Sequence, residues 1–191
     1  MTSANGLPTI MTYTGRTIDF LNPEPAEISI EDIAHGLALE CRFARQCRTH
    51  YSVAQHSVLV AGMMEKSELW GDGLLTSKET IKMALLHDAA EAYLGDVPRP
   101  LKKLLPDYRE IEERIHAAIS ERFNLALPYV PKSVKDFDAA ILGAEGKALM
   151  PAGWDDFSGF PDGGVEIVPI PAMAAKELFL LKFELLFGKD A

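Results

Sequence analysis

Residues 81–95 read IKMALLHDAAEAYLG and place a His-Asp pair, His87 and Asp88, directly after a run of apolar residues. The apolar spacing predicts a helix that stops at Gly95. An ionised aspartate in the middle of an apolar helix is costly unless it is paired or bound to a metal. Glu91 follows at helical spacing from both residues. A buried histidine alone is more often a hydrogen-bonded core residue, but this combination favours a functional site.

Two further polar residues interrupt apolar helical patterns. His56 lies in SVAQHSVLVAGMM and Asp138 lies in SVKDFDAAILGAEGKALM. The four anomalies are explained together if His56, His87, Asp88 and Asp138 converge on one cation. Two imidazoles and two carboxylates suit a first-row transition metal and leave coordination positions for water or substrate. We therefore expect one divalent metal, with manganese, cobalt, iron and zinc as candidates.

The remaining capping residues, turn residues and apolar spacing predict an all-α domain of about six helices. Residues 1–12 are expected to be flexible, and residues 13–191 to form a single domain that begins with an extended segment or small hairpin at 13–20. Ser29, Ser52 and Ser133 are predicted N-caps, and Thr76 to Glu79 a capping box. The expected helices cover residues 30–40, 52–64, 76–95, 106–125, 133–150 and 171–187. The Gly-, Pro- and Asp-rich run 151–164 is too long for a simple connector.

Composition limits the function classes. The chain has 191 residues, 48% of them apolar and 25% charged, as in an ordinary soluble globular protein. Its net charge of −9 argues against binding to duplex nucleic acid, which requires a basic face. We find neither a secretory signal nor a membrane span, so a cytoplasmic location is expected. Cys41 and Cys47 are interpreted as reduced packing residues.

Three arginines, Arg42, Arg45 and Arg48, recur at a spacing of three residues just before His56. They form either a solvated charged face or a cluster that binds phosphate groups. No glycine-rich loop is followed by Lys-Ser or Lys-Thr, which excludes a P-loop nucleotide hydrolase.

The strings YSVAQHSVLVA, LLHDAAEAYLGDVPRPLK and VKDFDAAILGAE, within residues 13 to 150, carry a family resemblance. The chain resembles the HD-domain metal-dependent phosphohydrolases, whose signature is a helix-borne His, a later His-Asp pair and a distal Asp. Within that superfamily it is most similar to the bacterial 5′-deoxynucleotidase branch and its phage relatives, some of which hydrolyse deoxynucleoside triphosphates such as dATP.

This resemblance implies a role for each matching residue. The metal ligands are His56, His87, Asp88 and Asp138. Glu91 is implied to position or deprotonate the attacking water, and Asp96, in the Gly-Asp-x-Pro turn, to lie by the sugar or the water network. Arg48 and Lys102 are implied to meet phosphate. Asp96 has an ordinary alternative, because aspartate also favours such turns for local reasons.

The expected function is metal-dependent hydrolysis of a small nucleotide, either a deoxynucleoside 5′-monophosphate or a deoxynucleoside triphosphate. One alternative is a catalytically silent HD module that only binds nucleotides. Another is an HD-type di-iron oxygenase, but that class carries two additional histidines and only His116 is present. Cyclic-dinucleotide phosphodiesterases carry a Gly-Tyr-Pro motif that is missing here. The last helix, KELFLLKFELLF, is apolar on more than one face, so a homo-oligomer is expected.

Overall fold

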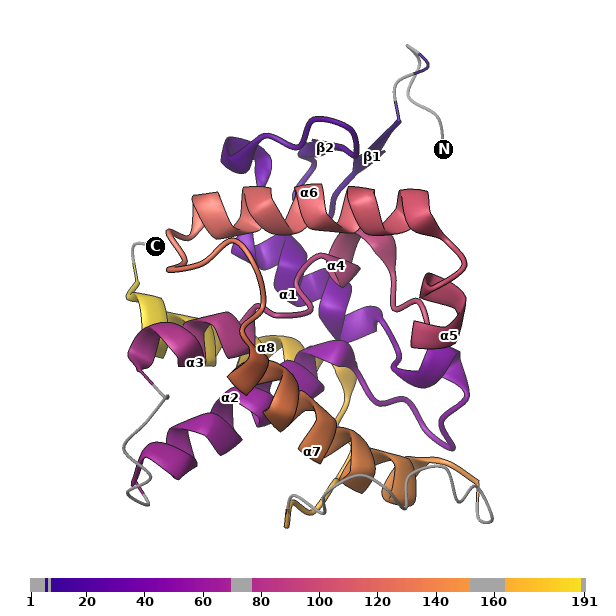
Figure 1. Cartoon of the computed structure of the whole chain (residues 1–191), viewed down its shortest axis with the longest axis vertical. Coiled ribbons are helices and arrows are strands. Elements are labelled where there is room, and N and C mark those ends of the chain that lie inside the picture. Colours follow the sequence, from indigo (N-terminus) through magenta and orange to yellow (C-terminus); the bar gives the residue numbers. More distant parts are fainter. Residues whose placement is uncertain (1–5, 7, 70–76, 152–163, 190–191) are drawn as a thin grey trace.

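The computed structural model describes residue 6 and residues 8–69, 77–151 and 164–189 (Figure 1). The all-α prediction is confirmed, since six helices of eight or more residues form the described domain. Two single-turn helices, α4 (Glu91–Leu94) and α5 (Arg99–Lys102), and two 3-10 turns, η1 (Pro25–Glu27) and η2 (Phe43–Arg45), join them. The six long helices are α1 (Ile30–Leu39), α2 (Val53–Leu69), α3 (Lys78–Leu85), α6 (Pro106–Arg122), α7 (Lys132–Leu149) and α8 (Ala172–Phe187).

A small antiparallel hairpin precedes the helices. Strand β1 (Thr9–Met11) pairs with β2 (Thr17–Asp19), so the hairpin begins within the stretch that we expected to be flexible. Thr14 in the connecting turn donates both its backbone N–H and its hydroxyl to the carboxylate of Asp32, at 2.7 and 2.8 Å. These bonds fasten the hairpin to α1.

Helices α1, α2, α3 and α8 pack against one another and enclose most of the core. Ile33, Leu37, Leu85 and Phe179 are among the side chains that are fully buried there. Helix α8 also exposes a stripe of leucines, Leu178, Leu181 and Leu185, on its outer face, and assembly of the chain stays a prediction. Among the described residues, no helix has the length and apolar character needed to cross a bilayer.

The structure corrects the prediction of one continuous helix through the His-Asp pair. Helix α3 ends at Leu85, and His87 and Asp88 lie in a turn before α4. His87 Nδ1 donates to the Ala84 carbonyl at 2.7 Å. The Glu91 N–H bonds the carbonyl three residues before it, on Asp88, at 2.9 Å. The bond from the His87 ring and this backbone bond to the third preceding residue replace regular α-helical hydrogen bonds in the turn. His87 and Asp88 therefore do not lie on the surface of a continuous helix.

Helix starts agree with the sequence in part. Ser52 is an N-cap as predicted, because its hydroxyl accepts the Gln55 N–H at 3.1 Å. Ser77 caps α3, one residue later than the capping box implies. The prediction that Ser133 caps α7 is wrong, because Pro131 is the residue before the first turn. Proline has a fixed φ and needs no hydrogen-bond acceptor for its nitrogen, which suits a helix start.

Helix α1 crosses α4 at close range, and this contact positions Glu91. A Cβ added to Gly36 would lie 2.6 Å from the Ala92 carbonyl oxygen. Backbone atoms on both sides leave no flexible side chain to move aside. The crossing therefore requires a glycine at this position of α1.

We expect Gly36→Ala to lower the free energy of unfolding by about 1–3 kcal/mol, as overpacking of a tight contact does. Gly62→Ala is the matched control, because a Cβ at this position of α2 would meet nothing within 4 Å. That change should raise stability by roughly 0.5–1 kcal/mol through the gain in helix propensity. Denaturant unfolding of both variants gives the comparison, and equal effects would contradict the close crossing.

Candidate metal centre

Three of the predicted ligands lie close together and the fourth adjoins them, although they come from three separate segments. One ligand atom from each of His56, His87 and Asp138 lies within 4.8 Å of the others. Asp88 adjoins this group, with Oδ2 3.2 Å from His87 Nε2 and 3.8 Å from His56 Nε2. Helix α2, the turn after α3, and helix α7 thus bring two imidazoles and two carboxylates together.

Hydrogen bonds fix which nitrogen of each imidazole faces this point. His56 Nδ1 lies 2.7 Å from Glu145 Oε1, and His87 Nδ1 lies 2.7 Å from the Ala84 carbonyl oxygen. Carboxylate and carbonyl oxygens accept, so each Nδ1 donates, and Nε2 is the nitrogen of each ring that can offer a lone pair to a cation. Both Nε2 atoms are buried without a hydrogen-bond partner. Buried polar atoms normally have partners, so these two fit a cation.

The charges at this point also suit a cation. Burial and the Asp88 charge oppose ionisation of Asp138, but its contact with His56 and the charge of His87 outweigh them and lower its pKa to about 2. The pKa of Asp88 lies below its usual range despite burial, because His87, His56 and Arg42 favour the charged form. Both carboxylates are therefore ionised near neutral pH.

Two more carboxyl groups lie close by and behave differently. Burial, together with the negative charges of Asp88 and Asp96, holds the pKa of Glu91 well above its ordinary value. Burial and the Asp88 charge also raise the pKa of Asp96, against the opposing charge of Arg42. Glu91 Oε2 is buried without a hydrogen-bond partner. A carboxyl with a raised pKa beside a candidate metal point suits a group that exchanges protons with bound water.

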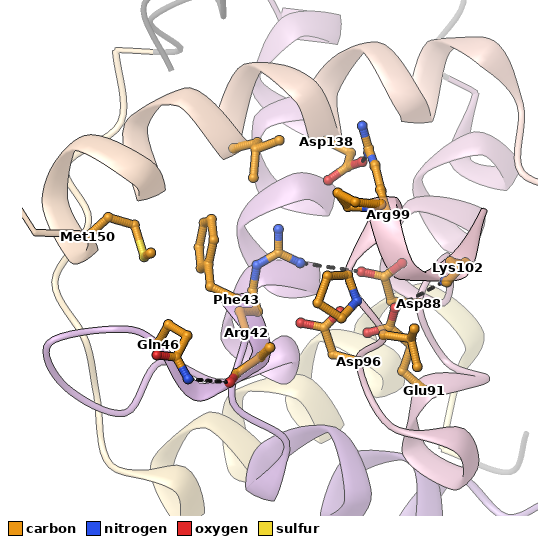
Figure 2. Close-up of a pocket in the computed structure, with 15 residues that line it drawn as sticks. Arg42, Phe43, Gln46, Asp88, Glu91, Asp96, Arg99, Lys102, Asp138 and Met150 are labelled. Atoms are coloured by element: carbon orange, nitrogen blue, oxygen red, sulfur yellow. Dashed lines mark hydrogen bonds and ion pairs between the residues drawn. The ribbon is translucent and has the colours of Figure 1, made fainter. Parts of the chain in front are cut away.

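Four carboxyl groups of this region, those of Asp88, Glu91, Asp96 and Asp138, lie at the wall of a cavity of about 640 Å³ (Figure 2). His87 lines two smaller cavities that share Asp88 with it. The cations Arg42, Arg99 and Lys102 line the larger cavity, and each lies within 4 Å of one of these carboxylates. The rest of the wall is mostly apolar, with one amide, and consists of Phe43, Ala44, Gln46, Val97, Pro98, Pro100, Leu142 and Met150. The cavity has the size and the mixed lining of a small-molecule site.

The cationic residues differ from the sequence prediction. Lys102 does line the cavity, with Nζ 2.6 Å from Glu112 and 3.9 Å from Glu91. Arg99, which we did not single out, reaches Asp138 Oδ2 with Nη2 at 2.7 Å. Arg48 is exposed and lines none of the described cavities. Its contact with phosphate stays a prediction that the geometry does not favour.

Of the two alternatives left open for the arginine cluster, the solvated face does not hold for Arg42. Its side chain is buried, with 8% of the residue exposed, and donates from Nε to Glu145 Oε2 at 3.1 Å. Its Nη1 lies 3.6 Å from Asp88 Oδ2 (Figure 2). Glu145 was overlooked although a signal exists, since it lies two turns after Asp138 on the same face of a helix.

The residues that follow Arg42, 43–45, form a left-handed turn at the cavity. Phe43, Ala44 and Arg45 have φ values of 56°, 50° and 66°. Residues with a Cβ disfavour this conformation by roughly 1–2 kcal/mol each. The turn is held at both ends, because the Arg42 N–H bonds the Tyr51 carbonyl at 3.0 Å and the Arg48 N–H bonds the Leu149 carbonyl at 2.9 Å.

Comparison with known proteins gives a consistent result. The profile of a family described as HD domain matches residues 42–141. The uncharacterized protein YfdR of Escherichia coli (strain K12) is 40% identical over 152 residues, which cover 80% of this chain and 76% of that protein. The uncharacterized protein RCAP_rcc00048 of Rhodobacter capsulatus is 41% identical over 115 residues, which cover 59% of this chain and 56% of that protein.

Metal affinity should depend on pH through His56. Burial and Arg42 disfavour its protonated form, but Glu145 and Asp138 outweigh them and raise its pKa in the metal-free protein to about 9. A metal must displace this proton, so below that pKa the apparent affinity should fall about tenfold per pH unit as the pH drops. Cobalt binding measured against a competing chelator between pH 7 and 8.5 tests the slope, and an affinity that does not change over this range would contradict it.

Proposed function

Since the chain belongs to the HD domain family, we propose that it is a divalent-metal-dependent phosphohydrolase acting on small nucleotides. Deoxynucleoside 5′-monophosphates and deoxynucleoside triphosphates are the proposed substrates. The observation that carries the proposal is the pair of buried imidazole Nε2 atoms without partners beside Asp88 and Asp138. These two carboxylates line a cavity together with Arg42, Arg99 and Lys102. Nitrogen and oxygen ligands beside a cavity that also carries three cationic side chains suit metal-assisted hydrolysis of a phosphate ester.

The ligand set proposed for the ion is His56, His87, Asp88 and Asp138. A divalent ion held there would lower the pKa of bound water and polarise a phosphoryl oxygen. Glu91 stands beside this point with a free buried Oε2, and we assign it the proton from the attacking water. The charge of Lys102, 3.9 Å from Glu91 Oε1, partly offsets the burial that raises the pKa of Glu91.

The cavity wall suggests how a nucleotide would lie. Arg42 and Arg99 flank the proposed metal ligands and can meet phosphate oxygens as charge-assisted donors. Phe43, Met150 and Leu142 offer apolar surface to the nucleoside, and Gln46 offers an amide. Asp96 lies between these two regions in the proposed pose and would accept a hydrogen bond from the sugar or from ordered water.

Charge balance favours one of the two substrate types. Three cationic and four acidic side chains line the cavity. When all four carboxyl groups are ionised, a divalent ion makes the sum of charges slightly positive, which balances a phosphate monoester better than a triphosphate, because charges in a partly buried site are costly when unmatched. We therefore rank deoxynucleoside monophosphates first, with inorganic phosphate as the released product.

A substrate screen tests the function. The purified protein, loaded in turn with manganese, cobalt and zinc, is incubated with deoxy- and ribonucleoside mono- and triphosphates, and the phosphate product is identified. We expect release of inorganic phosphate from the monophosphates. Release of tripolyphosphate would shift the assignment to triphosphates. Tight nucleotide binding without hydrolysis under any metal would favour the catalytically silent module.

Glu91→Gln separates proton transfer from metal binding. The amide keeps the size of the side chain but cannot take a proton, so we expect metal content near that of the wild type and a rate lower by roughly 10²- to 10⁴-fold. Glu121→Gln is the control, because Glu121 is an exposed residue of α6 away from the cavity. Metal analysis and single-turnover kinetics of both variants are the measurements, and a wild-type rate in Glu91→Gln would remove Glu91 from the mechanism.

A further inference from the structure

Glu145 lies behind the candidate metal centre and lines none of the described cavities. Its side chain is fully buried and both of its oxygens are engaged. Oε1 accepts from His56 Nδ1 at 2.7 Å. Oε2 accepts from Arg42 Nε at 3.1 Å and lies 3.0 Å from Arg42 Nη2. The carboxylate therefore joins a proposed metal ligand to a cation that lines the cavity.

We propose that Glu145, held by Arg42, is the positioning residue of this metal centre. Its carboxylate keeps the hydrogen of His56 on Nδ1 and turns Nε2 toward the shared point. The inference rests on the metal centre of the proposed function. It adds two side chains, Glu145 from α7 and Arg42 from the segment before η2, which orient His56 before any ion binds.

The two histidines differ in what orients them, and this difference explains why Glu145 is needed. His87 lies in a turn, where its Nδ1 reaches a backbone carbonyl of the preceding helix, that of Ala84. His56 lies inside α2, and its backbone N–H bonds the Ser52 carbonyl in the regular helical pattern. Carbonyls within a helix are already used in this way, so the acceptor for His56 Nδ1 must come from another element.

Helix α7 supplies that acceptor together with a ligand. Asp138 and Glu145 are seven residues apart, two turns of one helix face, and they contact opposite nitrogens of the same ring. Asp138 Oδ1 lies 3.3 Å from His56 Nε2, and Glu145 Oε1 lies 2.7 Å from His56 Nδ1. The ring is thus held from both sides by one rigid element.

Arg42 also contacts a second proposed ligand, Asp88. Its Nη1 lies 3.6 Å from Asp88 Oδ2, while its Nε and Nη2 hold Glu145. One guanidinium therefore contacts the group behind His56 and also a proposed ligand. A purely structural ion pair would be replaceable by apolar side chains of similar volume, often without loss of stability. This alternative is the one that the experiment must separate from positioning.

Two double variants make that separation. Arg42→Met with Glu145→Met removes both charges and the acceptor, and Arg42→Met with Glu145→Gln removes both charges but keeps an acceptor for His56. Each leaves the net charge of the chain unchanged, so a long-range electrostatic change cannot explain a difference between them. Ile119→Ala is the control for lost stability, since Ile119 is a fully buried residue of α6 that lines none of the described cavities.

The first readout is cobalt affinity by chelator competition, together with the visible absorption of the bound cobalt, neither of which needs a substrate. We expect the Met/Met variant to bind cobalt roughly 10- to 100-fold more weakly than wild type and with an altered spectrum, as loss of a ligand's hydrogen-bond partner typically does. The Met/Gln variant should recover most of this affinity, and Ile119→Ala should bind as wild type does.

The second readout needs no variant. In the zinc-loaded wild-type protein, nitrogen NMR of the imidazoles should show a hydrogen on His56 Nδ1 and zinc at Nε2. Equal cobalt affinity in both double variants, or a His56 that lacks the Nδ1 hydrogen, would overturn the positioning role and leave the proposed function standing. A wild-type protein that binds no cobalt would overturn the metal centre itself and the proposed function with it.

Discussion

Burial of ionisable side chains at the bottom of the cavity constrains everything around them. An unpaired charge in such a place costs several kcal/mol, so each group needs a partner of opposite charge or a hydrogen-bond donor. Arg42 and Glu145 satisfy each other, and Arg99 satisfies one oxygen of Asp138. After this pairing the buried atoms that remain without a partner include both imidazole Nε2 atoms and one oxygen of Glu91. These buried atoms without a hydrogen-bond partner mark the places where a cation and a water molecule fit.

The elements of the fold serve this pairing in different ways. Helix α7 sets the distance between Asp138 and Glu145, and α2 places the ring of His56 between them. The turn after α3 contributes the His-Asp pair because the backbone leaves the helix at Leu86. The close crossing of α1 and α4 at Gly36 then fixes the position of Glu91. A regular scaffold thus holds irregular segments in place at the site.

Much of the site was visible in the sequence for one reason. A charged or imidazole side chain within an apolar helical repeat is conspicuous, because burial without a partner is costly. His56 and Asp138 were found in this way, and the His-Asp pair as well, although the helix expected to carry it is interrupted. Most of the long helices also follow from their apolar spacing.

What the sequence could not show depends on contacts between distant segments or on backbone choices without a local signal. The left-handed turn at Phe43 to Arg45 contains no glycine, so nothing in its composition indicates a positive φ. Arg42 is therefore indistinguishable from its exposed neighbours until the chain has folded. The same holds for Arg99, which follows a proline and acquires its role from Asp138, 39 residues later.

The partners of the centre are far apart along the chain, which affects how the protein acquires it. Arg42 and Glu145 are separated by 103 residues, and His56 and Glu145 by 89. Contacts across such separations require large loops to close, which costs chain entropy. A nascent or partly folded chain holds the same side chains as scattered weak ligands. An ion that binds the folded protein more tightly than the unfolded chain shifts the folding equilibrium toward the native state. Metal supply would thereby influence the amount of folded protein in a cell, independently of any catalytic turnover.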